Sequence, residues 1–164
     1  MHTLILLRHG KAETTSGGGG DFERGLTDRG KSDSALIGHT LARAGIAPDL
    51  VLVSTARRAM ETWEAARAAF PSAKVAPARE LYHATLEVLE EAIEAAGAAV
   101  SRLMIVGHNP GLHELALALS SARSSGAAKT LAESFPTAAA AVFERNRQGQ
   151  LTLDRFLTPR RERA

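Results

Sequence analysis

Three short, continuous apolar runs set the strongest constraint on how this chain can fold. They are LILL at 4–7, LVLV at 50–53 and LMIV at 103–106. Each has the length of a strand, and none alternates between apolar and polar residues, which is typical of strands buried on both faces of a parallel sheet. Parallel strands need long crossover connections, usually helices, and long segments separate each run from the next. The runs therefore predict an α/β fold with a mostly parallel sheet.

Helical patterns fill the segments between these runs. Apolar residues recur at helical spacing in 27–44 and 86–96, and 56–70 is rich in alanine. Thr27 is a candidate N-cap for the first of these helices, and Gly45 is a candidate stop. We therefore expect helices on both faces of the sheet.

The last third of the chain predicts one more helix and a hairpin. Asn109 can cap a helix that has Pro110 in its first position. AAAAVFER at 138–145 is typical of a strand, NRQG at 146–149 of a turn, and LTLDRFL at 151–157 alternates as a final strand. Together with the preceding elements, this predicts a three-layer α/β/α arrangement.

Composition narrows the class of protein further. The 164 residues, 45% of them apolar, suit a single domain over 1–164 with one core. The absence of cysteine excludes a disulfide framework, a thiol nucleophile and a zinc site built on cysteine.

A formal charge of +2 gives no reason to expect nucleic acid as a partner. No run is long enough to span a membrane and the N-terminus lacks a signal-peptide pattern, so we expect a cytoplasmic protein without a membrane partner.

Polar side chains follow each apolar run at the point where the strand is predicted to end. Arg8 and His9 follow the first run, Arg57 lies shortly after the second, and His108 lies shortly after the third. In open α/β sheets, ligands bind outside the carboxyl ends of the strands. If the three strands are neighbours, these four side chains converge.

The four residue types suit a phosphoryl group. The guanidinium groups of Arg8 and Arg57 can each hold phosphoryl oxygens through paired hydrogen bonds. His9 and His108 can supply a nucleophile and a second donor near neutral pH. No carboxylate cluster stands at these strand ends to bind magnesium, so we expect a metal-free site in which arginine takes the place of the cation. Arg58, the neighbour of Arg57, is expected to face the opposite side as an exposed ion-pair partner.

Each feature also has a structural interpretation. A single histidine at a strand end is more often structural than catalytic, and a single arginine is usually an exposed ion-pair partner. The combination of four complementary residues favours an anion-binding active site. SGGGG at 16–20 is interpreted as a flexible surface loop, or alternatively as a loop that gates the substrate.

Four segments resemble the histidine phosphatase superfamily, which has the phosphoglycerate mutase-like fold. LILLRHGKAE at 4–13 is similar to the superfamily signature, and ERGLTDRGK at 23–31 resembles its R-x-LT-x-x-G segment. VLVSTARRAMETWEAA at 51–66 resembles the segment S-x-A-x-R-A-x-x-T, and LMIVGHNPGLHELALAL at 103–119 resembles the second-histidine segment. The short chain and the motif GHNPG resemble those of the compact SixA-like branch of the superfamily, the phosphohistidine phosphatases.

The resemblance implies a role for each matching residue. His9 would attack phosphorus and become phosphohistidine, while Arg8 and Arg57 would clamp the phosphoryl oxygens. His108 would donate to the phosphoryl group and stabilise charge in the transition state. Water would then hydrolyse the phosphoenzyme, and no cofactor is implied. Gly10 would leave room for the phosphate to approach the backbone.

The residue that protonates the leaving group is left open. Many superfamily members use a glutamate for this step, and Glu80 in PARELYHA is the main candidate, with Glu13 as the second. A solvated or ion-paired carboxylate is the alternative interpretation of both. His83 is a candidate for lining the pocket.

The expected substrate follows from the lack of a clear general acid in the sequence. Phosphohistidine carries a phosphoramidate bond whose imidazole is easily protonated near neutral pH, whereas an alkyl alcohol leaves poorly without an acid. The sequence therefore predicts a metal-independent phosphatase that dephosphorylates phosphohistidine in a protein partner. The alternatives are a phosphatase for small phosphate esters and a catalytically inactive module that binds phosphate or phosphoproteins.

Overall fold

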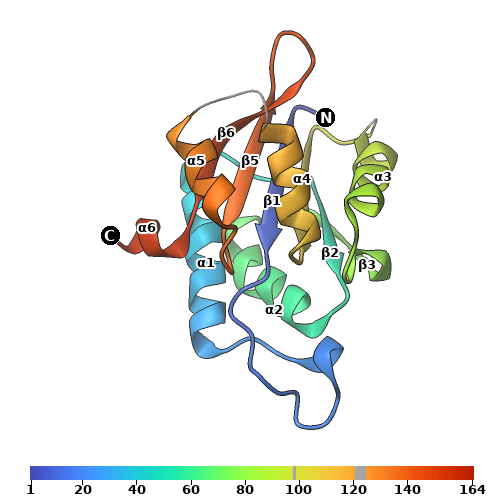
Figure 1. Cartoon of the computed structure of the whole chain (residues 1–164), viewed down its shortest axis with the longest axis vertical. Helices are drawn as coiled ribbons and strands as arrows, with labels where there is room; N and C mark the ends of the chain where they lie inside the picture. Colours follow the sequence, from blue (N-terminus) through green and yellow to red (C-terminus); the bar gives the residue numbers. More distant parts are fainter. Residues whose placement is uncertain (98, 121–124) are drawn as a thin grey trace.

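A six-stranded sheet forms the centre of the protein in a computed structural model that describes residues 1–97, 99–120 and 125–164 (Figure 1). The strand order is β3-β2-β4-β1-β5-β6, in which β1 to β4 run parallel, β5 runs antiparallel to β1, and β6 runs antiparallel to β5. The strands are β1 (Thr3–Arg8), β2 (Leu50–Ser54), β3 (Lys74–Ala78), β4 (Arg102–Gly107), β5 (Ala140–Arg145) and β6 (Leu151–Leu157).

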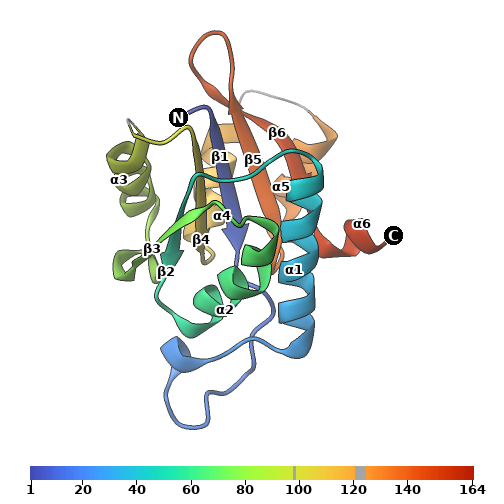
Figure 2. The same cartoon turned by 180° about the vertical axis from the view of Figure 1, so that it is seen from behind.

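Helices cover both faces of this sheet. Figure 1 shows α3, α4 and α5 in front of the strands, and Figure 2 shows α1 and α2 on the opposite face. The helices are α1 (Asp28–Arg43), α2 (Arg57–Ala66), α3 (Leu86–Gly97), α4 (Gly111–Ser120), α5 (Gly126–Glu133) and α6 (Pro159–Arg163), with short 3-10 turns η1 (Asp21–Glu23), η2 (Arg67–Ala69) and η3 (Arg79–Leu81). None of the helices in the described ranges has the length and apolar character needed to cross a membrane.

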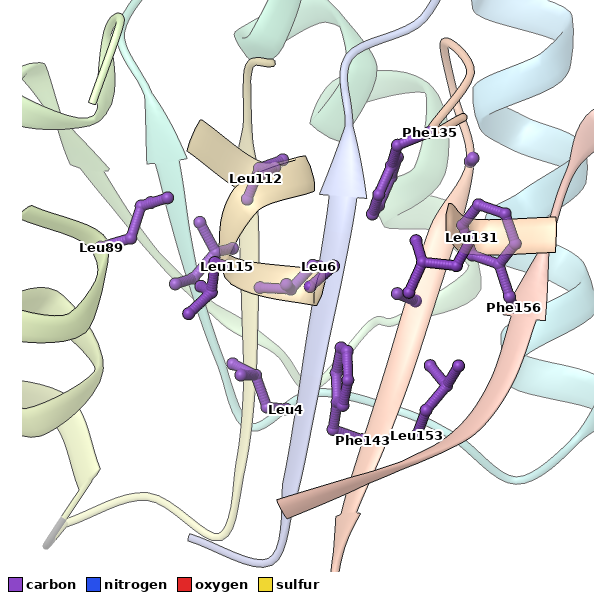
Figure 3. Packing of buried hydrophobic residues seen from close by; sticks show 14 of the residues in the cluster. Leu4, Leu6, Leu89, Leu112, Leu115, Leu131, Phe135, Phe143, Leu153 and Phe156 are labelled. Atoms are coloured by element: carbon purple, nitrogen blue, oxygen red, sulfur yellow. The ribbon is translucent and has the colours of Figure 1, made fainter. Parts of the chain in front are cut away.

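The central strands are buried on both faces, as their continuous apolar runs predict. Leu4 and Leu6 of β1 point into the cluster under α3, α4 and α5, which Figure 3 shows. Ile5 and Leu7 point the other way, into the cluster under α1 and α2. Because successive side chains of a strand face opposite sides, each central strand contributes to both layers of the core.

The predicted α/β architecture is confirmed, and so is the adjacency of the three apolar runs. They form β1, β2 and β4, and β4 lies between the other two. Thr27 is the N-cap of α1, since its hydroxyl accepts a hydrogen bond of 3.0 Å from the Gly30 amide. The predicted hairpin is formed by β5 and β6.

Several elements differ from the expectations, and the helices α5 and α6 were not predicted. The strand β3 was not predicted, and its exposed sequence with Pro77 is tolerated because it lies at the edge of the sheet. The helix expected to begin at Pro110 begins at Gly111. Asn109 does not cap it, because its Oδ1, the atom that would accept from the helix amides, has no partner among the described residues, and its Nδ2 donates to the Phe135 carbonyl.

Candidate active site

Two histidine rings meet at the carboxyl end of the sheet. Arg8 at the end of β1 pairs with Gly107 at the end of β4, so His9 and His108 leave the sheet side by side. Their ring centroids are 5.2 Å apart, and both side chains are buried. The predicted convergence of these two residues is therefore present in the structure.

The arginine that reaches His9 from α2 is Arg58, and the prediction that Arg57 does so is wrong. Arg58 is buried, and its Nε donates to Nε2 of His9 over 3.3 Å. Arg57 is exposed, and its Nε donates to the Glu61 carboxylate over 2.8 Å. The buried side of α2 is formed by residues one helical turn apart, Arg58 and Thr62 among them, and Arg57 lies outside it.

Arg8 approaches the site from the end of β1. Its Nη1 donates to the Phe135 carbonyl over 2.9 Å, which anchors the guanidinium. Its Nε is buried and has no partner among the residues that the structure describes. Burial, and then the charge of Arg58, lower the pKa of Arg8. The site therefore contains two guanidinium groups close enough to repel each other, an arrangement that an anion relieves.

His9 is held as a neutral ring with a defined tautomer. Its Nδ1 lies 2.7 Å from the Gly10 carbonyl oxygen, and a carbonyl can only accept, so Nδ1 carries the proton. Nε2 then presents a lone pair toward Arg58. Burial lowers the pKa of His9 to about 4, with further contributions from Arg58, Arg8 and Arg24. At neutral pH the ring is therefore uncharged, with the lone pair of Nε2 facing the site.

His108 is positioned by Ser54 at the end of β2. Its Nε2 lies 2.7 Å from the Ser54 hydroxyl, which also accepts a 3.3 Å hydrogen bond from the Ala56 amide. Its Nδ1 is buried and has no partner within the described part of the chain. Burial, followed by the His9 and Arg58 charges, lowers the pKa of His108 to about 3.

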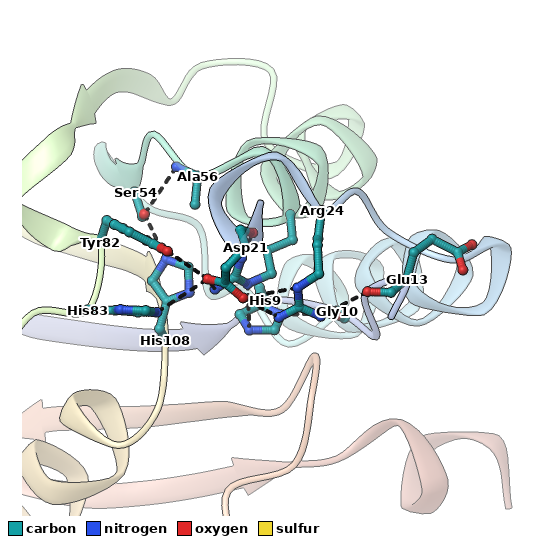
Figure 4. Close-up of polar contacts among 11 residues, drawn as sticks. His9, Gly10, Glu13, Asp21, Arg24, Ser54, Ala56, Tyr82, His83 and His108 are labelled. Atoms are coloured by element: carbon teal, nitrogen blue, oxygen red, sulfur yellow. Dashed lines mark hydrogen bonds and ion pairs between the residues drawn. The ribbon is translucent and has the colours of Figure 1, made fainter. Parts of the chain in front are cut away.

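Asp21 lies at the mouth of this cluster, and sequence reasoning missed it (Figure 4). Its Oδ2 accepts from the Tyr82 hydroxyl at 2.6 Å and from Arg58 Nη2 at 3.0 Å. Its Oδ1 accepts from Arg24 Nη2 at 2.7 Å, and its backbone carbonyl accepts from Arg58 Nη1 at 2.8 Å. The Tyr82 hydrogen bond, and then those of the two arginines, hold the pKa of this carboxyl well below its usual range. The exposed glycine-rich loop 16–20 leads directly into this residue.

Gly10 serves the packing of α1. A Cβ atom at this position would lie 2.5 Å from the Gly30 carbonyl oxygen and 2.7 Å from the Ser34 hydroxyl. Glycine is therefore needed here for the close approach of the first turn of α1, and room for a phosphate beside the backbone stays a prediction.

The predicted carboxylic acids lie away from the two histidines. Glu80 is exposed on η3, and within the described ranges it makes no hydrogen bond or ion pair with the cluster. The carboxylate of Glu13 points away from His9 in Figure 4. The role of Glu80 as an acid stays a prediction. Among residues 1–97, 99–120 and 125–164, no three histidine, aspartate or glutamate side chains are grouped as metal ligands.

Comparison with known proteins identifies the family. The sequence pattern of the histidine phosphatase superfamily (branch 1) matches residues 4–143. The chain belongs to this superfamily. An uncharacterized protein of Mycobacterium tuberculosis is 35% identical over 139 residues, which cover 84% of this chain and 85% of the relative.

Solved structures of the superfamily share the fold. The proposed phosphohistidine phosphatase SixA from Agrobacterium tumefaciens superposes with a TM-score of 0.84 at 31% identity, over 96% of this chain and 98% of that one. A phosphoglycerate mutase from Plasmodium falciparum has a TM-score of 0.62 at 17% identity, over 94% of this chain and 89% of that one. The phosphoglycerate mutase-like fold is thus confirmed, and the protein is a phosphatase of the histidine phosphatase superfamily.

The superfamily pattern itself contains the signal for the correct arginine. Aligned letter by letter, S-x-A-x-R-A-x-x-T begins at Ser54, places its arginine at Arg58 and ends at Thr62. Ser54 holds His108, and the Thr62 hydroxyl accepts from the Gly10 amide over 2.9 Å. Each fixed letter of the second half of the pattern therefore corresponds to a residue on the buried side of α2.

Proposed function

We propose that this phosphatase removes the phosphoryl group from phosphohistidine in a partner protein, without a metal ion, through a phosphohistidine intermediate on His9. The observation that carries the proposal is the state of the His9 ring. Gly10 holds the proton on Nδ1, and Nε2 presents its lone pair to the guanidinium of Arg58. This is the arrangement that a nitrogen nucleophile for phosphorus requires.

In the first step, Nε2 of His9 attacks phosphorus as the bond to the leaving group breaks. The ring keeps its proton on Nδ1 and becomes a phosphoimidazolium cation, and the Gly10 carbonyl, 2.7 Å from Nδ1, stabilises this charge. The low pKa of free His9 ensures that the nucleophile is not already protonated at neutral pH.

The phosphoryl oxygens would be held by donors that already point into the site. Nη1 and Nη2 of Arg58 donate to Asp21. Its Nε therefore faces His9 and would face the phosphoryl group. Arg8 Nε and His108 Nδ1 are buried donors at the site that have no partner among the residues the structure describes. With the Ser54 hydroxyl donating to Nε2 of His108, Nδ1 carries a proton, and both groups can donate to the anion.

In the second step, water attacks phosphorus and the bond to Nε2 breaks. Because Nδ1 of His9 still carries its proton, the ring leaves as a neutral imidazole and needs no further acid. The two arginines neutralise the charge of the phosphoryl group throughout, which is the role that a metal ion has in other phosphoryl-transfer sites.

The substrate class rests on the leaving group and on the open mouth. The Asp21 carboxylate at the mouth is held ionised by hydrogen bonds from Tyr82, Arg24 and Arg58 and so cannot act as an acid, which favours an imidazole over an alkoxide as leaving group. The mouth residues Asp21 and His83 are 43% and 59% exposed, so a side chain on the surface of a folded partner can reach them. The likeness to the proposed phosphohistidine phosphatase SixA supports the same substrate.

Phosphate release from two substrates tests the proposal. Wild type and His9→Ala are compared on a phosphohistidine-bearing protein and on para-nitrophenyl phosphate. We expect wild type to release phosphate from the phosphohistidine protein and the variant to release none. Release from the aryl ester alone would move the substrate to small phosphate esters. Release from neither, by a folded protein that binds phosphate, would indicate a binding module.

A further inference from the structure

His83 is a histidine at the mouth of the site that the mechanism above does not use. Its backbone has a φ of +52°, in the left-handed region that residues other than glycine seldom adopt. Its ring stacks on the Tyr82 ring, with centroids 4.0 Å apart and an interplanar angle of 24°. The side chain is nevertheless 59% exposed, so the fold holds this imidazole in place at an open position.

Charged and titratable groups surround His83 on the side that faces the site. Its Nε2 is 3.5 Å from Oδ2 of Asp21, and its ring centroid is 5.9 Å from that of His108. Arg24 and Arg58 lie behind Asp21 and bond to the same carboxylate. Figure 4 shows His83, Tyr82 and His108 grouped on one side of Asp21.

The loop that carries His83 is packed against the turn that carries His108. A Cβ atom on Gly111, the first residue of α4, would collide with the Ala84 carbonyl oxygen. Only glycine at 111 allows the backbone after His83 to come this close to the start of α4. This backbone contact therefore holds the segment that carries His83 beside the segment that carries His108.

We propose that His83, whose Nε2 lies 3.5 Å from Oδ2 of Asp21, is the proton donor to the leaving imidazole, an inference that rests on the proposed function. Attack and departure at phosphorus are roughly in line. Because His9 is buried, a leaving group opposite it points toward the mouth, where His83, Asp21 and Tyr82 lie.

The position of His83 suits the proton that this leaving group needs. An imidazole that departs from phosphorus without a proton is an imidazolate anion, a poor leaving group. A proton on the other ring nitrogen lets it depart as neutral imidazole. That nitrogen lies on the far side of the ring from phosphorus, so its donor belongs farther out than a donor to an ester oxygen. An exposed imidazole at the mouth meets this requirement.

The proton balance closes over the two steps. His83 gives its proton to the remote nitrogen of the substrate ring while the bond from phosphorus to His9 Nε2 forms. The electron pair of the broken N–P bond stays on the departing imidazole, and His83 becomes neutral. In the second step the neutral ring takes a proton from the attacking water, which restores the donor.

A pair of substrates separates proton donation from a structural role. Para-nitrophenolate leaves without a proton, whereas imidazole does not. We expect His83→Asn to lower kcat/KM for a phosphohistidine protein about 100-fold, the usual size of a general acid effect, and for para-nitrophenyl phosphate by less than about threefold. Asparagine tolerates the left-handed backbone. His39→Asn, at an exposed position on α1, is the matched control and should leave both values unchanged.

Chemical rescue gives a second readout. His83→Gly also accepts a positive φ, and it removes the ring. Free imidazole in the buffer should restore phosphate release from the phosphohistidine protein in this variant and should not change release from the aryl ester.

Other results for these variants would assign His83 a different role or none. An equal loss on both substrates would make His83 a structural residue, and no loss on either would remove it from the reaction. A selective loss in Glu80→Gln, with His83→Asn unaffected, would assign the proton to Glu80. Wild-type protein that cleaves only the aryl ester would reject the proposed substrate and this role with it, a result distinct from a selective failure of the His83 variants.

Discussion

Nε of Arg58 lies 3.3 Å from Nε2 of His9, while the neighbouring Arg57 turns outward to Glu61. Two adjacent arginines on one helix thus have opposite environments. Arg58 is held from the other side by two hydrogen bonds to Asp21, so its orientation toward His9 is fixed before any phosphate binds. This contrast makes the pair a matched test of the site.

Replacing the two arginines in turn should give opposite results. We expect Arg58→Ala to lower kcat/KM by about 100-fold or more, because it removes charged donors aimed at the phosphoryl group. Arg57→Ala removes only an exposed ion pair, which contributes about 0.5 kcal/mol or less, so activity should stay within about threefold of wild type. Steady-state kinetics on one substrate decides the matter. A larger loss in Arg57→Ala would mean that the second clamp is the exposed arginine.

The hydroxyl of Ser54 should matter through His108. In Ser54→Ala, Nε2 of His108 loses its 2.7 Å partner, and a buried ring nitrogen left unpaired costs about 1–3 kcal/mol. We expect kcat to fall about tenfold while circular dichroism stays native. Ser120→Ala is the control, because the Ser120 hydroxyl donates to the Ala116 carbonyl of its own helix, away from the histidines. Unchanged kcat in Ser54→Ala would show that His108 needs no such support.

Stability should depend on pH through the two buried histidines. Their folded pKa values, about 4 for His9 and about 3 for His108, lie below the unfolded value near 6.5. Between these values the unfolded chain binds protons that the folded one does not, so stability is lost as pH falls from about 6.5 toward 4. The slope is at most about 1.4 kcal/mol per pH unit for each histidine.

Urea titrations at pH 7, 6 and 5 measure this dependence. His9→Gln and His108→Gln should each flatten it, and His39→Gln on the surface should leave it as in wild type. If the free energy of unfolding is the same at the three pH values, the two rings are not held neutral by burial.

The central strand β4 should dominate the stability of the core. Ile105 is fully buried in the cluster under α3, α4 and α5, so Ile105→Ala should lower the free energy of unfolding by about 2–5 kcal/mol. Leu117 on α4 is partly exposed, and Leu117→Ala should cost clearly less. Comparable melting midpoints for the two variants would contradict the central position of 103–106.

The elements that follow a strong hydrophobic rule were predictable from the sequence. The runs that became β1, β2 and β4 are apolar on both faces, and this pattern fixes both their burial and their parallel pairing. The strand β3 carries no such pattern, because an edge strand with Val75 exposed and Pro77 within it buries little apolar surface. Its existence depends on pairing with β2.

The candidate site was predictable only for residues whose position follows directly from the end of a strand. His9 and His108 follow directly from strand ends, so register brings them together. The choice between Arg57 and Arg58 depends on the phase of α2, which the buried residues Ala59 and Thr62 indicate. Asp21 begins the short turn η1, and no local pattern indicates that its carboxylate bonds to Arg58 and Tyr82.

Trapping the phosphoenzyme tests the central claim most directly. The protein is mixed briefly with phosphohistidine substrate, quenched in alkali, which preserves phosphohistidine, and digested for mass spectrometry. We predict one phosphoryl group on the peptide that contains His9, on Nε2 of its ring, and none in His9→Ala. Phosphate release by wild type with the phosphoryl group on another residue, or with no phosphoenzyme under rapid quench, would contradict nucleophilic catalysis by His9.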